Sequence, residues 1–321
     1  MALDPATDPA TAGIAGWSPD PAAAPGPDPA AEPEGFVVLA EGDVRLHFLD
    51  WGGPDAGSTA PAVLLLPGLL GPAWTWAPVA RRLSRVRHAV VADLRGQGLS
   101  DSPMHGYDRD TLAADAVAVA EGAGLRDGDA PIVLAGHGFG AIVAAGAAAR
   151  LGARCAGLVL VDGGFERHEV TTGLDVDEFL RGLDEPPEIL RSMTAYLADR
   201  RGFDPASWDV DQERAALDGV VETAAGHVVR AVRPFVVEAI VRAMFAHDPA
   251  PTLAAVDAPV IALVALGAGD AGARLAELRR CGEARLAAGR PPIRATGFPD
   301  AHNLVRYRPA EVTQAILRVA G

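Results

Sequence analysis

The stretch Gly136-His137-Gly138-Phe139-Gly140 joins two segments of very different character. Before it lies Pro131–Ala135, a short apolar run with the length of a buried strand, and after it comes the alanine-rich segment Phe139–Leu151, with the length of a helix. Three glycines in five residues allow a sharp turn, because glycine adopts backbone conformations that are closed to other residues. The sequence therefore predicts a strand, a tight turn and a helix in immediate succession.

Apolar segments of strand length and helix length alternate on both sides of this turn. Such alternation predicts an α/β fold, in which a mostly parallel sheet is flanked by helices on both faces. The expected strands are Phe36–Ala40, Val44–Trp51, Ala62–Leu66, His88–Asp93, Pro131–Ala135, Gly157–Val161, Val260–Leu266 and Ile293–Gly297. The expected helices are Trp76–Ser84, Asp110–Gly122, Phe139–Leu151, Ala271–Ala288 and Pro309–Val319.

The alternation stops between Gly164 and Val256, where helical patterns occur without a convincing strand. We interpret residues 164–256 as a helical cap inserted into an α/β core made of residues 36–163 and 257–321. The expected cap helices are Val176–Leu183, Pro187–Arg200, Asp211–Glu222 and Phe235–Phe245.

The first 35 residues differ from the rest in composition. They carry eight prolines and six acidic residues, and they have no basic residue. Such a segment buries too little apolar surface to offset the entropy lost on ordering. We therefore expect residues 1–35 to form a disordered tail rich in proline, alanine and aspartate.

Composition limits the classes of function. The 321 residues carry a formal net charge of −14, which argues against nucleic acid and anionic membranes as partners. Every basic residue is arginine, so lysine-based Schiff-base chemistry is excluded.

Cys155 and Cys281 lack the spacing of metal ligands, and we expect no metal site. The N-terminus has no secretory-signal pattern and no apolar run has the length of a membrane span, so the expectation is a cytoplasmic protein that binds a small molecule. Its oligomeric state is left open.

Three further stretches carry motif information. Leu66-Pro67-Gly68-Leu69-Leu70-Gly71 follows a predicted strand, Asp93-Leu94-Arg95-Gly96-Gln97-Gly98-Leu99-Ser100-Asp101 follows another, and Asp300-Ala301-His302-Asn303-Leu304 precedes the last helix. Together with the glycine-rich turn, these stretches resemble the α/β-hydrolase family across nearly all of Phe36–Gly321. In that family the turn is the nucleophile elbow Gly-x-Ser-x-Gly, and its central residue attacks the substrate.

The resemblance implies a role for each site residue. Gly138 occupies the nucleophile position and has no side chain with which to attack. The N–H groups of Leu69 and Phe139 would form the oxyanion hole, and His302 would be the catalytic base. The chain order favours Asp270 as the carboxylate partner of His302, with Asp162 as the alternative acid. Neither a cofactor nor a metal ion is implied.

A second fingerprint overlaps the elbow. Gly136-x-Gly138-x-x-Ala141 also satisfies the dinucleotide-binding pattern between a strand and a helix. That pattern normally follows the first strand of its domain, whereas here a hairpin and two further strands precede it. A Rossmann-type dinucleotide-binding protein is therefore kept as a second alternative.

Glycine at position 138 leaves three interpretations of function. In the first, which we favour, His302 and an aspartate activate water or move a proton on a small or medium apolar carbonyl compound. In the second, the protein is a non-catalytic pseudoenzyme that binds a small ligand. In the third, Gly138 is a local or engineered change in an otherwise standard hydrolase.

Overall fold

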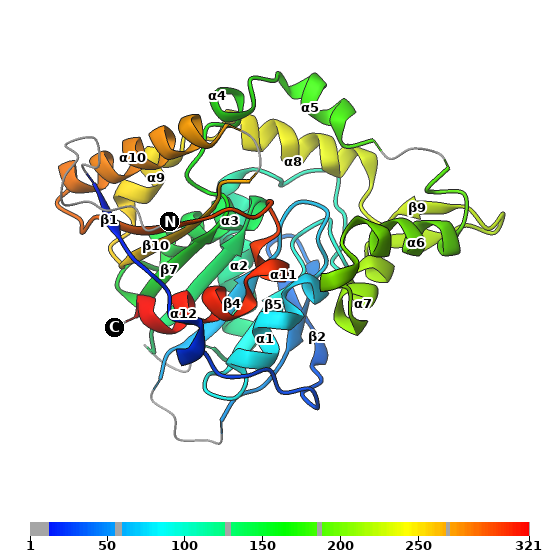
Figure 1. Ribbon diagram of the computed structural model, residues 1–321, viewed down its shortest axis with the longest axis horizontal. Coiled ribbons are helices and arrows are strands. Elements are labelled where there is room, and N and C mark those ends of the chain that lie inside the picture. The colour runs from blue at the N-terminus through cyan, green and yellow to red at the C-terminus, as the bar shows by residue number, and fades with distance from the viewer. Residues whose placement is uncertain (1–12, 55–59, 126–129, 185–187, 268–269, 321) are drawn as a thin grey trace.

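The computed structural model describes residues 13–54, 60–125, 130–184, 188–267 and 270–320. Its centre is a nine-stranded sheet with the strand order β1-β11-β10-β7-β6-β4-β5-β3-β2 (Figure 1). The strands are β1 (Ile14–Gly16), β2 (Glu34–Ala40), β3 (Val44–Asp50), β4 (Ala62–Leu66), β5 (Ala89–Ala92), β6 (Ile132–His137), β7 (Cys155–Val161), β10 (Val260–Ala265) and β11 (Ile293–Phe298). Only the pairs β2–β3 and β3–β5 of this sheet are antiparallel, so the predicted mostly parallel sheet is confirmed.

Helices cover both faces of the sheet, because successive residues of each buried strand point to opposite sides. In β4, Leu64 and Leu66 pack into one core, whereas Val63 and Leu65 pack into the other. The first core holds the helices α2 (Arg109–Gly122), α3 (Phe139–Leu151), α9 (Pro249–Ala255) and α10 (Ala271–Ala287). The second core holds α1 (Ala77–Leu83), α11 (Leu304–Tyr307) and α12 (Pro309–Val319). None of the helices in the described ranges is long and apolar enough to cross a membrane.

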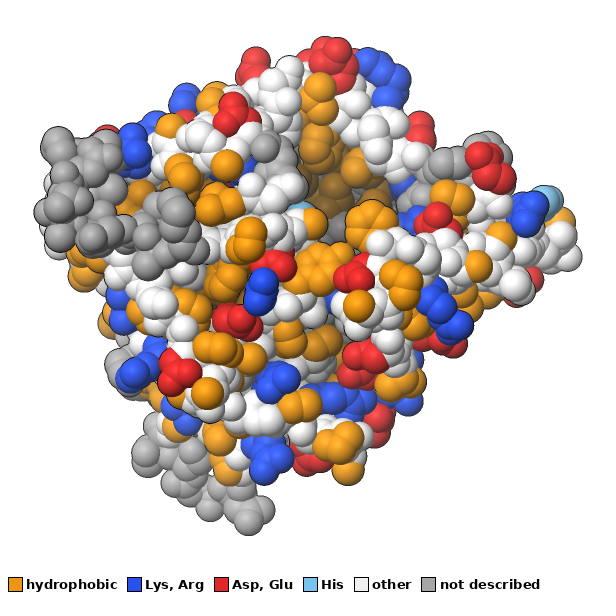
Figure 2. Space-filling model, viewed as in Figure 1, with side chains coloured by type: hydrophobic (Ala, Val, Ile, Leu, Met, Phe, Trp, Pro, Cys, Tyr) orange, Lys and Arg blue, Asp and Glu red, His pale blue; other side chains and the backbone are white. Residues whose placement is uncertain are grey.

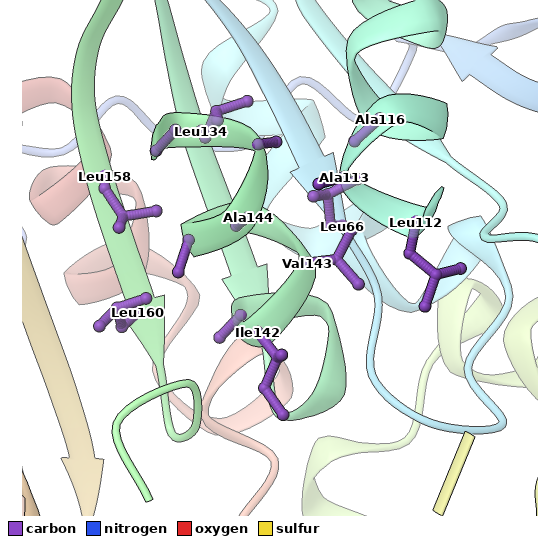
Figure 3. Packing of buried hydrophobic residues seen from close by; sticks show 14 of the residues in the cluster. Leu66, Leu112, Ala113, Ala116, Leu134, Ile142, Val143, Ala144, Leu158 and Leu160 are labelled. Carbon is purple, nitrogen blue, oxygen red and sulfur yellow. The ribbon is translucent and has the colours of Figure 1, made fainter. Parts of the chain in front are cut away.

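Helix α3 lies directly on the strands that carry the site. Ile142, Val143 and Ala144 of this helix belong to the same buried cluster as Leu134 of β6 and Leu158 of β7 (Figure 3). All five side chains are at most 3% exposed. The beginning of α3, and with it the turn before the helix, is therefore fixed to the sheet by close packing.

The strand order excludes the Rossmann alternative. In a Rossmann domain the glycine-rich turn follows the first parallel strand, which lies at the centre of the order 3-2-1-4-5-6. Here the turn follows β6, which comes after the parallel strands β1, β4 and β5 along the chain, and β6 lies between β4 and β7. The dinucleotide-binding interpretation of Gly136, Gly138 and Ala141 is therefore wrong.

The segment between β7 and β10 is mainly helical, as expected, but differs from the prediction in two respects. It contains α4 (His168–Thr172), α5 (Val176–Gly182), α6 (Met193–Phe203), α7 (Val210–Asp218), α8 (Pro234–Ala246) and α9. First, β8 (Val220–Glu222) and β9 (Val228–Arg230) form an antiparallel hairpin where a longer helix was expected. Second, α9 packs against α3 and α10 of the core rather than over the sheet edge. In Figure 1, α6, α7 and β9 project to the side of the sheet.

The prediction of a disordered tail is wrong for residues 13–35, whereas residues 1–12 lie outside the described residues. Strand β1 pairs in parallel with β11, and the N–H of Trp17 donates to the carbonyl of Ala295 over 3.0 Å. One acidic residue of this segment contacts two arginines that are distant in sequence. Glu32 forms ion pairs with Arg81 at 3.1 Å and with Arg214 of α7 at 2.6 Å. Composition does not predict the packing of residues 13–35, because their partners on β11, α1 and α7 are distant in sequence.

Candidate active site

The glycine-rich turn has the geometry of a nucleophile elbow. Gly138 lies between β6 and α3 with φ 53° and ψ −117°, a conformation that side-chain-bearing residues rarely adopt. A β-carbon on Gly136 would lie 2.2 Å from the carbonyl oxygen of Gly140, and one on Gly140 would lie 2.3 Å from that of Leu66. The turn therefore requires glycine at both flanking positions.

His302 faces Gly138 across the end of the sheet. Its loop joins β11 to α11, and its Nε2 lies 3.1 Å from the point where a β-carbon on Gly138 would stand. The Nδ1 of His302 is bonded to Oδ2 of Asp162 at 2.6 Å. With Nδ1 held by the carboxylate, Nε2 is the ring nitrogen directed to the elbow.

The carboxylate partner of His302 is Asp162, and the preference for Asp270 is wrong. Asp162 follows β7, which lies between β6 and β10, and its side chain is completely buried. Asp270 instead caps α10, where its carboxylate accepts a hydrogen bond from the N–H of Ala273 at 3.0 Å. Chain order alone does not distinguish an aspartate that caps a helix from one that faces the histidine.

A buried arginine holds Asp162 from the other side. Oδ1 of Asp162 accepts hydrogen bonds from Arg274 Nη2 at 2.7 Å and from the N–H of Ala265 at 2.6 Å. Arg274 also donates through Nε to Glu166 at 2.5 Å. Burial tends to raise the pKa of Asp162, but the hydrogen bond and charge of His302, with Arg274 and Ala265, hold this pKa below its ordinary value. Asp162 is therefore ionised and fixed in direction.

Glu166 completes this network, and neither Glu166 nor Arg274 is among the site residues expected from the sequence. Burial raises the pKa of Glu166 above its ordinary value, although the charge of Arg274 opposes the change. The side chains of Asp162, Glu166 and Arg274 are all buried from water. Because a buried charge is costly without a partner, each of the three is stabilised by the opposite charge beside it. No local pattern marks them, because Arg274 lies 112 residues from Asp162 along the chain.

The loop after β4, residues 66–71, is held by Gln97 of the stretch 93–101. Gln97 accepts a hydrogen bond from the N–H of Leu70 at 2.5 Å and donates one to the carbonyl of Gly68 at 3.3 Å. The N–H groups of Leu69 and Phe139 have no acceptor among the described residues. Both residues line the same cavity as His302. Phe139 also begins α3, where the helix dipole favours negative charge.

His137 supports the His302 loop. Its Nε2–H donates to the carbonyl oxygen of His302 over 3.0 Å, and the two rings are tilted with centroids 4.6 Å apart. Burial, together with the charge of His302, lowers the pKa of His137 to about 4. His137 is therefore neutral at pH 7 and acts as a hydrogen-bond donor to the loop backbone.

His302, Gly138, Leu69 and Phe139 line a cavity of about 980 Å³. Its floor is formed by the ends of the strands and its walls by the inserted segment, including Phe179 of α5 and Met244 of α8. Figure 2 shows the molecule hollowed in this region, with hydrophobic side chains on the wall. Among the described residues, no group of three histidine, cysteine or acidic side chains is placed to hold a metal ion.

Comparison with known protein families matches residues 63–315 to the alpha/beta hydrolase family. The N-formylmaleamate deformylase of Pseudomonas putida is 41% identical over 129 residues, which are 40% of this chain and 44% of the relative. Epoxide hydrolase 4 of Mus musculus is 30% identical over 119 residues, 36% of this chain and 31% of the relative. The matched region thus spans less than half the length of these curated relatives.

Solved structures show the same fold at lower sequence identity. An E-2-(acetamidomethylene)succinate hydrolase is 21% identical with a TM-score of 0.70, covering 90% of this chain and 99% of that chain. The thioesterase domain from the curacin biosynthetic pathway is 19% identical with a TM-score of 0.66, covering 89% of this chain and 99% of that one. The N-formylmaleamic acid deformylase of Pseudomonas putida S16 is 22% identical with a TM-score of 0.62, covering 90% of this chain and 100% of that one.

Proposed function

Because the chain belongs to the alpha/beta hydrolase family, we propose that it hydrolyses a small or medium carbonyl compound with water, rather than a serine, as the nucleophile. One observation carries the proposal. The His302–Asp162 pair is in place, and Nε2 of His302 is directed to a position where the chain has no side chain.

The missing side chain changes the first chemical step. Glycine cannot form an acyl-enzyme, and loss of the serine from a serine hydrolase costs on the order of a million-fold in turnover. Nε2 of His302 lies 3.1 Å from the position of a β-carbon on Gly138, so a water molecule or substrate hydroxyl near that position is within hydrogen-bond reach.

The proposed reaction uses the groups already described. Nε2 of His302 takes a proton from water while the water oxygen attacks the carbonyl carbon. The carbonyl oxygen becomes an oxyanion and accepts hydrogen bonds from the N–H groups of Leu69 and Phe139. The carbon–leaving-group bond then breaks, and His302 returns the proton to the leaving nitrogen or oxygen. Asp162 stabilises the imidazolium formed between these two steps.

The relatives favour an acyl compound as substrate. Two of them are named for an acylated nitrogen, an N-formyl group in one and an acetamido group in the other. The cavity has an apolar wall that includes Leu69, Phe179 and Met244. We therefore infer a compact N-acyl or ester substrate with an apolar portion.

Gly138 itself favours a second candidate function. A protein that has lost its nucleophile but retains a cavity of about 980 Å³ can bind the same class of compound without converting it. The two candidates differ in turnover and not in the ligand that they recognise.

An assay with a panel of formyl and acetyl amides and esters tests the proposal. We expect slow turnover without a burst, lost in His302→Ala and retained in His105→Ala, which changes an exposed histidine. Rates equal to the buffer rate for both the unmodified protein and His302→Ala would overturn the hydrolase proposal and leave the binding function.

A further inference from the structure

Arg306 differs from two other arginines of the cavity wall in its partners. Arg274 is paired with Asp162 and Glu166, and Arg200 with Asp199 at 3.2 Å. Arg306 instead donates through Nε to the hydroxyl of Ser207 at 2.6 Å and through Nη2 to the carbonyl of Asp204 at 2.9 Å. Both acceptors are uncharged.

No carboxylate among the described residues contacts Arg306 directly. The side chain of Asp204 accepts its hydrogen bonds from the hydroxyl of Ser207 at 2.6 Å and from the N–H of Ala206 at 3.2 Å. Asp204 therefore acts on Arg306 through its charge but forms no direct ion pair with it. A half-buried guanidinium without a carboxylate partner gains stability from an anion.

The guanidinium is held in a fixed position. Its central carbon lies 5.8 Å from the ring centroids of both Trp208 and Tyr307. Of its five N–H bonds, the contacts to Ser207 and Asp204 use two, and three remain. Because Nη1 and Nη2 each keep an N–H, they can form the planar fork that binds a carboxylate through two parallel hydrogen bonds.

Arg306 shares the cavity with the proposed catalytic groups. It belongs to α11, which begins two residues after His302, and it lines the cavity together with His302, Gly138 and Leu69. We propose that the cavity takes a substrate that carries a carboxylate, and that Arg306 binds this carboxylate while the acyl group lies at His302. The position of the acyl group rests on the proposed function, whereas carboxylate binding does not.

Calorimetric titration tests the binding step without turnover. The probes are the monoamide of glutaric acid, which carries one carboxylate, and the diamide, which is neutral and of nearly equal size. We expect the unmodified protein to bind the monoamide at least about tenfold more tightly than the diamide. Arg306→Gln should abolish this preference, and higher ionic strength should weaken it.

Arg308→Gln is the matched control. Arg308 also follows the His302 loop, but it pairs with Asp300 at 2.8 Å and does not line the cavity. This variant should keep the preference for the monoamide. The inference is overturned if the unmodified protein shows no preference, or if Arg306→Gln retains it while circular dichroism shows a native fold. Carboxylate selectivity without turnover of any ester or amide would overturn the proposed function and support this inference.

Discussion

Nε2 of His302 lies 3.1 Å from the point at which a β-carbon on Gly138 would stand. This separation is slightly shorter than most contacts made by real β-carbons, so a side chain at position 138 requires the ring to move by a few tenths of an ångström. The ring can do so, because 59% of the His302 side chain is exposed. The turn thus has room for a small side chain at position 138, where the chain carries glycine.

Gly138→Ser should restore serine chemistry. The variant should react with a fluorophosphonate probe at the introduced hydroxyl and gain esterase activity, because this hydroxyl lies beside His302. It should also lose about 1–3 kcal/mol of unfolding free energy, since serine is strained in this backbone conformation. Mass spectrometry and urea denaturation measure the two effects.

Gly138→Ala separates strain from chemistry. It should lose similar stability without gaining activity or probe labelling. Stoichiometric labelling of any serine in the unmodified protein would contradict the assignment of Gly138 to the nucleophile position.

The two candidate aspartates can be distinguished by paired substitutions. Asp162→Asn should reduce kcat/KM by at least about a hundredfold, because the imidazolium formed at His302 loses its charged partner. Asp270→Asn should stay within about twofold, because asparagine caps a helix as well as aspartate does. The reverse ranking in a steady-state assay would restore Asp270 as the partner of His302.

Arg274 should be a positioning residue for Asp162. Arg274→Gln leaves two buried carboxylates without their cation and should cost about 3–5 kcal/mol of unfolding free energy. Adding Glu166→Gln removes one of these charges and should recover part of the loss. Denaturant titration of the single and double variants measures this coupling, and strictly additive losses would refute it.

The turn between β6 and α3 can be predicted from the sequence because its close backbone contacts require glycine. Gly136 and Gly140 allow strand β6, the turn and helix α3 to pack together, and α3 was predicted with its observed bounds. The hairpin β8–β9 was missed because its first strand continues the apolar spacing of α7. Strand β1 was missed because three residues beside many prolines carry almost no local signal.

His247 should make stability depend on pH. It is 7% exposed, and burial, with the charge of Arg109, lowers its pKa to about 4. Between its ordinary pKa of about 6.5 and the lowered value, only the unfolded chain binds this proton, so stability falls as the pH falls. His247→Gln should reduce the loss of unfolding free energy between pH 7 and pH 5 by about 2 kcal/mol. Identical pH profiles would show that His247 is already solvated in the folded protein.

Removal of residues 1–33 should destabilise the protein. Strand β1 and the side chains of Ile14 and Trp17 pack on the sheet and its cores. We expect the melting temperature to fall by roughly 5 °C or more. Glu32→Gln alone should shift it by about 1 °C, because the Glu32 side chain is 53% exposed and its ion pairs are screened by water on that side. An unchanged melting temperature after the deletion would show that this packing contributes nothing.

Some residues of the candidate site can be predicted from sequence motifs, whereas the contacts between them form only in the folded chain. Gly138, Leu69, Phe139 and His302 were identified because a turn type or a loop position marks them. The pairing of His302 with Asp162 depends on the path of the loops after β7 and β11. A contact between residues 140 positions apart produces no characteristic spacing in the sequence from which it could be predicted.

Glu32 of the N-terminal segment also links α7, which forms part of the cavity wall, to α1 on the sheet. Asp211 and Arg214 lie on α7, whose neighbouring residues Gln212 and Ala215 line the cavity. Arg81 of α1 holds Asp211 through two hydrogen bonds of 2.8 and 2.9 Å, and Glu32 contacts both arginines. Displacement of α7 to admit a ligand would have to separate these contacts. The Arg81–Asp211 pair is buried and therefore poorly screened, whereas the Glu32–Arg214 pair is exposed, so ligand entry should respond only weakly to salt concentration.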